Sequence, residues 1–139
     1  IGARHIFIDR HDSARASASL KDALKSLAGN PRSVILFPEG TRSPDGEIHQ
    51  FKKGGLGLAL SLDMPVVPVA QCGTRDVLEK QSLRLKKGDV EMRLGRPIDP
   101  NLWQGKSKEE FADHVRAEVI SLKREWLAEK VLQPEAAKA

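Results

Sequence analysis

An apolar run that stops at a proline constrains the fold of this chain more than any other feature of its sequence. Residues 33–37 read Ser-Val-Ile-Leu-Phe, and Pro38 follows directly. Proline cannot donate a hydrogen bond to a sheet ladder, so the pattern predicts a buried strand that ends here. Glu39, Thr41 and Arg42 then stand at the carboxyl end of that strand. In open α/β sheets this is the edge at which ligands bind.

The side chains after the predicted strand suit an anionic ligand. Arg42 carries a planar fork of donors that matches phosphate or carboxylate oxygens. Gly40 lets the backbone turn sharply and approach a ligand closely, and Thr41 adds a hydroxyl donor. A polar connecting loop in which Glu39 pairs with Arg42 accounts for the same residues. The residues alone leave both interpretations open.

Strand-like and helix-like segments alternate at the start of the chain, which predicts an α/β fold. The apolar run at residues 6–8 predicts a strand over residues 5–9, and residues 14–27 have apolar side chains at helical spacing. With residues 33–37 they form a βαβ crossover, which implies a parallel pair of strands. We therefore expect a mostly parallel sheet with packed helices. One domain would span residues 1–132, and residues 133–139 would be a frayed tail.

Four further segments follow the loop. They are a helix over residues 54–62, a core strand over 65–70, a half-exposed antiparallel edge strand over 90–94, and a helix from about residue 108 to 130. Pro68 predicts an edge position or a bulge in the second of them. The last helix opens with a capping box of Ser107 and Glu110. Its apolar stripe, which we expect to cover the sheet, consists of Phe111, Val115, Val119, Leu122 and Trp126.

The amino-acid composition of the chain limits which kinds of ligand and partner we expect. The single cysteine, Cys72, excludes an internal disulfide and a cysteine-rich metal site within the 139 residues, and we expect no metal. A net charge of +4 suits anionic substrates, an anionic membrane surface or nucleic acid. With 4% aromatic residues and no tyrosine, base stacking is not expected, so we do not expect nucleic acid as a partner. Residues 75–87 are basic and contain leucines, which fits either an anionic bilayer contact or a solvated loop.

Three segments resemble conserved blocks of the glycerophospholipid acyltransferase family, in particular its 1-acyl-glycerol-3-phosphate acyltransferases. Residues 34–43, Val-Ile-Leu-Phe-Pro-Glu-Gly-Thr-Arg-Ser, with Phe-Lys-Lys-Gly at 51–54, resemble the third block. Ile-Phe-Ile-Asp-Arg at 6–10 is similar to the second block, and Pro-Val-Val-Pro-Val at 65–69 to the fourth. The blocks stand in the family's order, and the resemblance covers roughly the first hundred residues.

The resemblance implies a function and a set of site residues. The reaction would move a fatty acyl group from acyl-CoA or acyl-carrier protein to lysophosphatidic acid in phospholipid biosynthesis, with no other cofactor. Arg10 and Arg42 would bind the phosphate of the acceptor, although the residues alone favour a solvated strand-end charge for Arg10. Thr41 and the backbone of Gly40 would add hydrogen bonds, and Glu39 would buttress an arginine or contact the glycerol. The protein would be membrane-associated, at the cytoplasmic face.

One family block has no counterpart in this chain. The family's catalytic block is Asn-His, four further residues and then Asp, with the histidine as the general base. The histidines are His5, His11, His49 and His114, and the residues five positions later are Arg10, Ala16, Gly54 and Val119. We therefore expect no catalytic residue here, a block upstream of residue 1, an incomplete acyltransferase-type domain and an inactive isolated chain. Absence of that block upstream would instead indicate a non-catalytic module that binds anionic lipid or phosphate.

Overall fold

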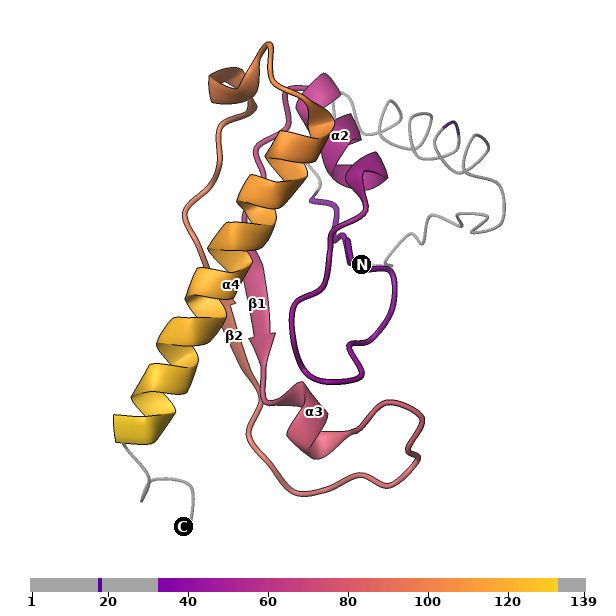
Figure 1. Cartoon of the computed structure of the whole chain (residues 1–139), viewed down its shortest axis with the longest axis vertical. Coiled ribbons are helices and arrows are strands. Elements are labelled where there is room, and N and C mark those ends of the chain that lie inside the picture. Colours follow the sequence, from indigo (N-terminus) through magenta and orange to yellow (C-terminus); the bar gives the residue numbers. More distant parts are fainter. Residues whose placement is uncertain (1–17, 19–32, 133–139) are drawn as a thin grey trace.

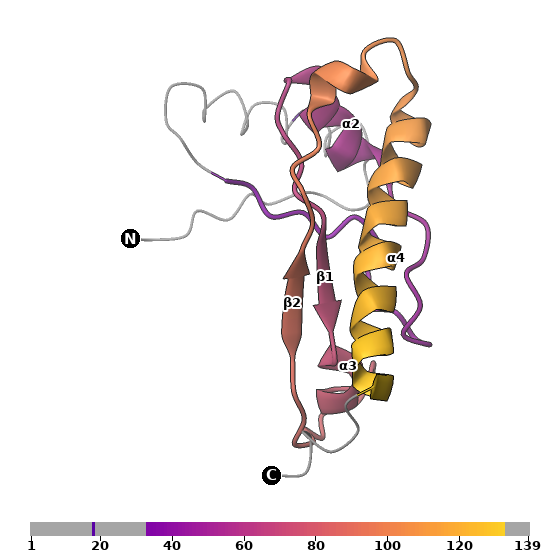
Figure 2. The same cartoon turned by 90° about the vertical axis from the view of Figure 1, so that its left-hand side faces the viewer.

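A computed structural model of the protein describes residue 18 and residues 33–132. In chain order the elements are α2 (Lys53–Ser61), β1 (Val69–Cys72), α3 (Thr74–Val77), β2 (Glu91–Leu94), the 3-10 helix η1 (Pro100–Trp103) and α4 (Lys108–Leu132). Helix α4 runs along the length of the molecule, with α2 beside its beginning and α3 near its end (Figure 1). The two strands lie side by side along α4 between these ends (Figure 2).

The described residues contain one sheet, formed by two antiparallel strands. β1 pairs with β2 in a register that runs from Val69 opposite Leu94 to Cys72 opposite Glu91. The antiparallel edge strand predicted for residues 90–94 is therefore confirmed. The predicted helix over residues 54–62 is confirmed as α2.

Pro68 interrupts the strand predicted for residues 65–70. Before the proline, Val66 and Ile98 form an isolated antiparallel bridge, and β1 begins only after it. The carbonyl of Pro68 accepts a hydrogen bond from the Gly95 amide at 2.8 Å, but proline has no amide hydrogen to return. The ladder is therefore interrupted at this buried residue, where the sequence predicted an edge position or a bulge.

Helix α4 supplies much of the core through its predicted stripe. Phe111, Val115, Val119 and Trp126 are buried, and Leu122 packs against them half-buried. They meet buried residues of the rest of the chain, namely Phe51, Leu56, Ala70 and Cys72. The predicted capping box is present, because the Glu110 amide donates to the Ser107 hydroxyl at 3.1 Å and the Ser107 amide donates to Glu110 Oε2 at 2.8 Å.

The buried strand predicted for residues 33–37 is wrong. These residues form no strand in the structure, and the side chains of Ile35 and Phe37 are 81% and 70% exposed. An apolar run becomes a strand only where a neighbour takes up its backbone hydrogen bonds, and β1 bonds to β2 instead. The expected partner strand at residues 5–9 and the crossover helix at 14–27 lie outside the described residues. The parallel pairing is therefore not confirmed.

Side chains of β2 alternate in a way that leaves its apolar side open. Met92 and Leu94 are exposed, whereas Arg93, opposite Ala70, turns toward α4. Its guanidinium donates to Glu129 of α4, with 2.8 Å between Nη1 and Oε1. The strand thus contacts the helix through an ion pair, because the small side chain across from Arg93 leaves room for its long stem.

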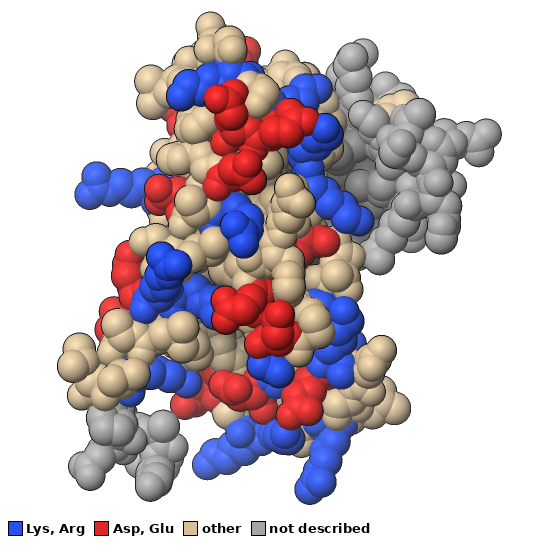
Figure 3. All heavy atoms as spheres, viewed as in Figure 1, with Lys and Arg blue, Asp and Glu red and all other residues tan. Residues whose placement is uncertain are grey.

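Charge is mixed rather than concentrated on the face seen in Figure 3, where Lys and Arg side chains alternate with Asp and Glu side chains. Within residue 18 and residues 33–132, no helix combines the length and the apolar character that crossing a bilayer requires. The same part of the chain holds no cluster of His, Cys, Asp or Glu side chains suited to a metal ion. The predicted tail at residues 133–139 lies outside the described residues.

Candidate functional site

The segment that begins at Pro38 forms a closed loop, the 38–52 loop. The Lys52 amide donates to the Pro38 carbonyl at 2.8 Å and brings the two ends together. At the start of the loop, the Gly40 amide donates to the Phe37 carbonyl at 3.0 Å in a tight turn. Gly40 has a φ of +72°, and a Cβ at this position would lie 2.9 Å from Lys52 Nζ. The left-handed backbone conformation of this turn therefore favours glycine, and the flexible end of the Lys52 side chain lies against it.

Asp45 organises the interior of the loop. Its Oδ1 accepts hydrogen bonds from the Glu47 amide at 2.9 Å and the Ser43 hydroxyl at 2.8 Å, and it lies 2.9 Å from His49 Nε2. The backbone donor of Glu47, followed by the Ser43 hydroxyl, holds the pKa of the Asp45 carboxyl well below its usual range. The Ser43 hydroxyl also accepts from the Gly46 amide at 2.9 Å. This network fixes the Pro-Asp-Gly bend that the sequence predicted.

Three basic side chains from other elements hold the loop from outside. Arg116 of α4 donates to the carbonyl of Ile48 at 2.6 Å through Nη2 and to that of His49 at 2.8 Å through Nε. Lys123, also on α4, donates to the carbonyl of Gly46. Arg75 of α3 donates through Nη1 to the carbonyl of Asp45 at 2.6 Å. We call Arg75, Arg116 and Lys123 the loop clamp, because they bind four nearby backbone carbonyls of the loop.

The loop carries four of the five residues that the sequence singled out. Thr41 and Arg42 are exposed, and Arg42 makes no ion pair with the residues that the structure describes. Glu39 does not pair with Arg42; its Oε2 instead accepts from the His49 amide at 3.2 Å across the loop. Arg10 lies outside the described residues, so its convergence with Arg42 stays a prediction. The loop thus presents to solvent the Thr41 hydroxyl and the Arg42 guanidinium, which is unpaired as far as the described residues go.

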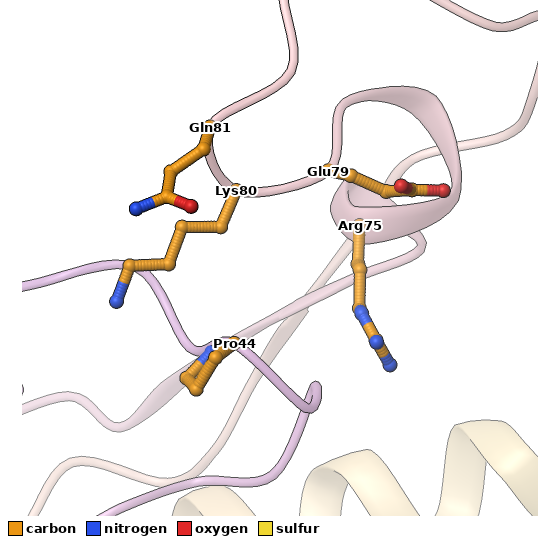
Figure 4. Close-up of a pocket in the computed structure, with 5 residues that line it drawn as sticks. All are labelled: Pro44, Arg75, Glu79, Lys80 and Gln81. Atoms are coloured by element: carbon orange, nitrogen blue, oxygen red, sulfur yellow. The ribbon is translucent and has the colours of Figure 1, made fainter.

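A hollow of about 320 Å³ lies beside the loop. Pro44 lines it from the 38–52 loop, and the opposite wall comes from α3 and the chain after it (Figure 4). The residues of that wall are Arg75, Glu79, Lys80 and Gln81. Two of these four side chains are basic, so the hollow suits an anionic group more than a cation.

The loop clamp was not found from the sequence. Arg116 and Lys123 stand seven positions apart on α4, which places both on one side of the helix. That spacing shows that they share a face. It does not show that this face meets a loop about seventy positions earlier in the chain, because such a contact is set by how α4 packs.

Comparison with known proteins shows that this chain is similar to acyltransferases. Residues 2–71, just over half of the chain, match the family model described as Acyltransferase. The 1-acyl-sn-glycerol-3-phosphate acyltransferase of Limnanthes alba is 39% identical over 101 residues, which are 73% of this chain and 36% of the relative. The human 1-acyl-sn-glycerol-3-phosphate acyltransferase alpha is 29% identical over 120 residues, covering 86% of this chain and 42% of the relative.

A solved structure resembles the fold as well. The crystal structure of the 1-acyl-sn-glycerophosphate (LPA) acyltransferase PlsC from Thermotoga maritima superposes with a TM-score of 0.68 and 35% sequence identity. The likeness covers 84% of this chain and 46% of that chain. The chain therefore spans less than half the length of each of these proteins.

Proposed function

Because this chain belongs to the acyltransferase family, we propose that the full-length protein transfers a fatty acyl group from an acyl thioester to lysophosphatidic acid, giving phosphatidic acid. One observation carries the proposal for this part of the protein. Arg42 stands exposed on the 38–52 loop and has no ion-pair partner among the described residues. An exposed arginine that no carboxylate of the described residues engages is suited to a phosphate brought by a substrate.

Each residue of the turn has its own part in binding the acceptor. In this proposal the Arg42 guanidinium binds phosphate oxygens in a forked contact, and the Thr41 hydroxyl donates a further hydrogen bond. Lys52, whose ammonium lies close to Gly40, adds a second positive charge beside the same backbone. Glu39 holds the turn through the amide of His49 rather than touching phosphate, which would repel it. Arg10 completes the site, as the resemblance implies.

The chemical step belongs to a histidine upstream of residue 1 in this proposal. That base removes the proton of the acceptor hydroxyl, and the oxygen attacks the thioester carbonyl. The carbon–sulfur bond breaks, and the histidine returns the proton to the sulfur, so that coenzyme A or the acyl-carrier protein leaves as a thiol. Residues of the 38–52 loop act earlier, by fixing the acceptor so that its hydroxyl meets the thioester. The mostly parallel sheet of the whole domain is part of the same proposal.

Because the proposed acceptor is a lipid, the protein has to meet its substrate at a membrane. We propose association with the cytoplasmic face, supported by the lipid nature of the acceptor and by the net charge of +4, which favours an anionic surface. The alternative of a non-catalytic lipid-binding module is not favoured, because the matching relatives are named as acyltransferases.

Replacement of Arg42 tests the proposal in the full-length protein. In Arg42→Ala we expect kcat/KM for lysophosphatidic acid to fall by about ten- to a hundredfold, because a charge-assisted contact contributes roughly 1.5–3 kcal/mol. The KM for the acyl donor should change little. The measurement is initial rates across a range of acceptor concentrations.

Two control variants separate the loss of the Arg42 contact from a general effect of removing a positive charge. Arg42→Lys keeps the charge and should recover part of the loss, whereas Arg96→Ala removes an exposed arginine outside the loop and should have no effect. If Arg42→Ala leaves both KM for the acceptor and kcat unchanged, Arg42 is not a phosphate ligand.

A further inference from the structure

The chain after α3 presents leucines to solvent on a basic loop. Residues 80–87, the 80–87 loop, contain four cations and belong to no helix or strand. Leu83 is 101% exposed and Leu85 is 72% exposed. Both leucines therefore lie in water, two positions apart on one irregular segment. Single exposed leucines are ordinary, but two so close together among basic residues are not.

Hydrogen bonds hold this loop in a defined shape. The Lys86 amide donates to the Val77 carbonyl at 2.9 Å and closes the loop onto α3. Lys86 Nζ also donates to Glu79 Oε1 at 2.5 Å, and the Arg84 amide donates to the Ser82 hydroxyl at 3.0 Å. These bonds tether the loop to α3 while Leu83 and Leu85 stay exposed. A loop without a partner would gain by turning these side chains inward.

The remaining cations of the loop make no ion pair within residues 33–132. Only Lys86 of the four has an ion-pair partner among the described residues, which leaves Lys80, Arg84 and Lys87. In Figure 3, basic side chains project beyond the lower edge of the molecule, where the chain after α3 lies in Figure 1. Apolar side chains flanked by cations match the interface of an anionic bilayer, which offers phosphates outside and acyl chains within.

We infer that the 80–87 loop is a membrane contact, with Leu83 and Leu85 in the interfacial layer of an anionic bilayer and Arg84 and Lys87 on lipid phosphates. Nucleic acid fits less well, because the loop offers no aromatic ring for stacking and its leucines would stay in water. The choice of a bilayer over another apolar, anionic partner rests on the proposed lipid substrate.

The same contact would serve the candidate site. Lys80 and Gln81, at the start of the loop, line the hollow that Pro44 of the 38–52 loop lines from the other side (Figure 4). A bilayer bound at Leu83 and Leu85 would therefore lie beside the turn that carries Arg42. An acceptor lipid could then reach that turn without leaving the membrane surface.

Vesicle binding of the full-length protein tests the inference. We expect Leu83→Ser/Leu85→Ser to weaken sedimentation with vesicles of equimolar phosphatidylcholine and phosphatidylglycerol by about tenfold. Arg84→Glu/Lys87→Glu should remove most of the preference for these vesicles over pure phosphatidylcholine. The matched controls, Leu102→Ser and Arg96→Glu/Arg124→Glu, change exposed residues elsewhere and should bind like the parent protein.

If another part of the protein also binds lipid, a fluorophore attached to the 80–87 loop still reports whether this loop contacts the membrane. An environment-sensitive fluorophore on Leu83→Cys, in a protein without other accessible cysteines, should shift to the blue with the anionic vesicles. The same label on Leu102→Cys should not. No shift at position 83, or salt-sensitive DNA binding with unchanged vesicle binding in the leucine variant, would overturn the inference. Either result leaves the Arg42 assay untouched, so failure of this inference is distinct from failure of the proposed function.

Discussion

Asp45 is the residue on which the geometry of the candidate site most depends. Its carboxylate binds a backbone amide, a hydroxyl and an imidazole within the 38–52 loop. All three partners lie within four positions in the sequence, so the network is local and needs no distant element. It explains why a polar, exposed loop holds one shape without a core of its own.

The ionisation of Asp45 gives a prediction about pH. Hydrogen bonds from the Glu47 amide and the Ser43 hydroxyl lower the folded-state pKa of Asp45, whereas the unfolded chain keeps the ordinary value of about 3.9. The ionised carboxylate therefore favours the folded loop above that ordinary value. This contribution is lost as the pH falls through the lowered folded-state pKa. Carboxyl chemical shifts followed by NMR should show a midpoint for Asp45 clearly below 3.9.

Ser43→Ala provides the control for this cause. Removal of the hydroxyl donor should raise the midpoint of Asp45 toward the ordinary value while the rest of the fold is unchanged. A midpoint of Asp45 near or above the ordinary value in the parent protein would contradict the network, and an unchanged midpoint in the variant would contradict the part assigned to Ser43.

Helix α4 has two roles at the scale of elements. One side buries the apolar stripe, and an adjoining side carries Arg116 and Lys123 to the carbonyls of the 38–52 loop. Backbone carbonyls in an irregular loop need donors, and two side chains of a rigid helix supply them here. The loop that carries Arg42 is thus held by a helix that contributes no residue to the proposed phosphate contact.

Arg116→Met tests this dependence by removing the donors and keeping much of the stem. We expect the free energy of unfolding to fall by about 1–2 kcal/mol, since charge-assisted bonds to two carbonyls are lost at a partly exposed position. Hydrogen exchange should speed up most at the amide of Lys52, which closes the loop, and KM for the acceptor should rise more than kcat falls. Urea denaturation, exchange and kinetics provide the measurements.

Arg124→Met is the matched control, because Arg124 is an exposed arginine of the same helix and makes no hydrogen bond within the described part of the chain. Equal exchange rates at Lys52 in both variants would show that the loop does not need Arg116.

At the scale of the whole molecule, one side of the sheet is packed and the other is open. Helix α4 covers the face with Ala70 and Cys72, whereas Met92 and Leu94 lie exposed on the opposite face. Ile35 and Phe37 are exposed as well. The core that holds the described residues together is therefore the layer between α4, α2 and one face of the strands.

Phe111 sits at the centre of that layer, with no exposed surface, and its ring meets Trp103 edge to face at 5.5 Å. Phe111→Ala should reduce the free energy of unfolding by about 3–5 kcal/mol, because the cavity adds to the loss of apolar burial. Leu102→Ala, at an exposed position of η1, should change it by less than about 0.5 kcal/mol. Thermal or urea unfolding of both variants decides whether α4 forms the core or only lies on it.

The sequence by itself determined the elements whose cause is local. The stripe and capping box of α4, the break at Pro68 and the sharp turn at Gly40 each follow from residues close together in the chain, because periodicity, caps and backbone freedom act over a few positions. The three blocks likewise identified the family before any coordinates, since their residue order is a property of the chain.

Only the tertiary structure decided what those elements meet. The apolar run at residues 33–37 has the composition of a strand, yet it forms none, because strand formation depends on a partner that the run itself does not specify. The contacts of Arg116 and Lys123 with the loop likewise join residues 67 to 77 positions apart. Pairing and packing are properties of two surfaces, and a local pattern describes only one of them.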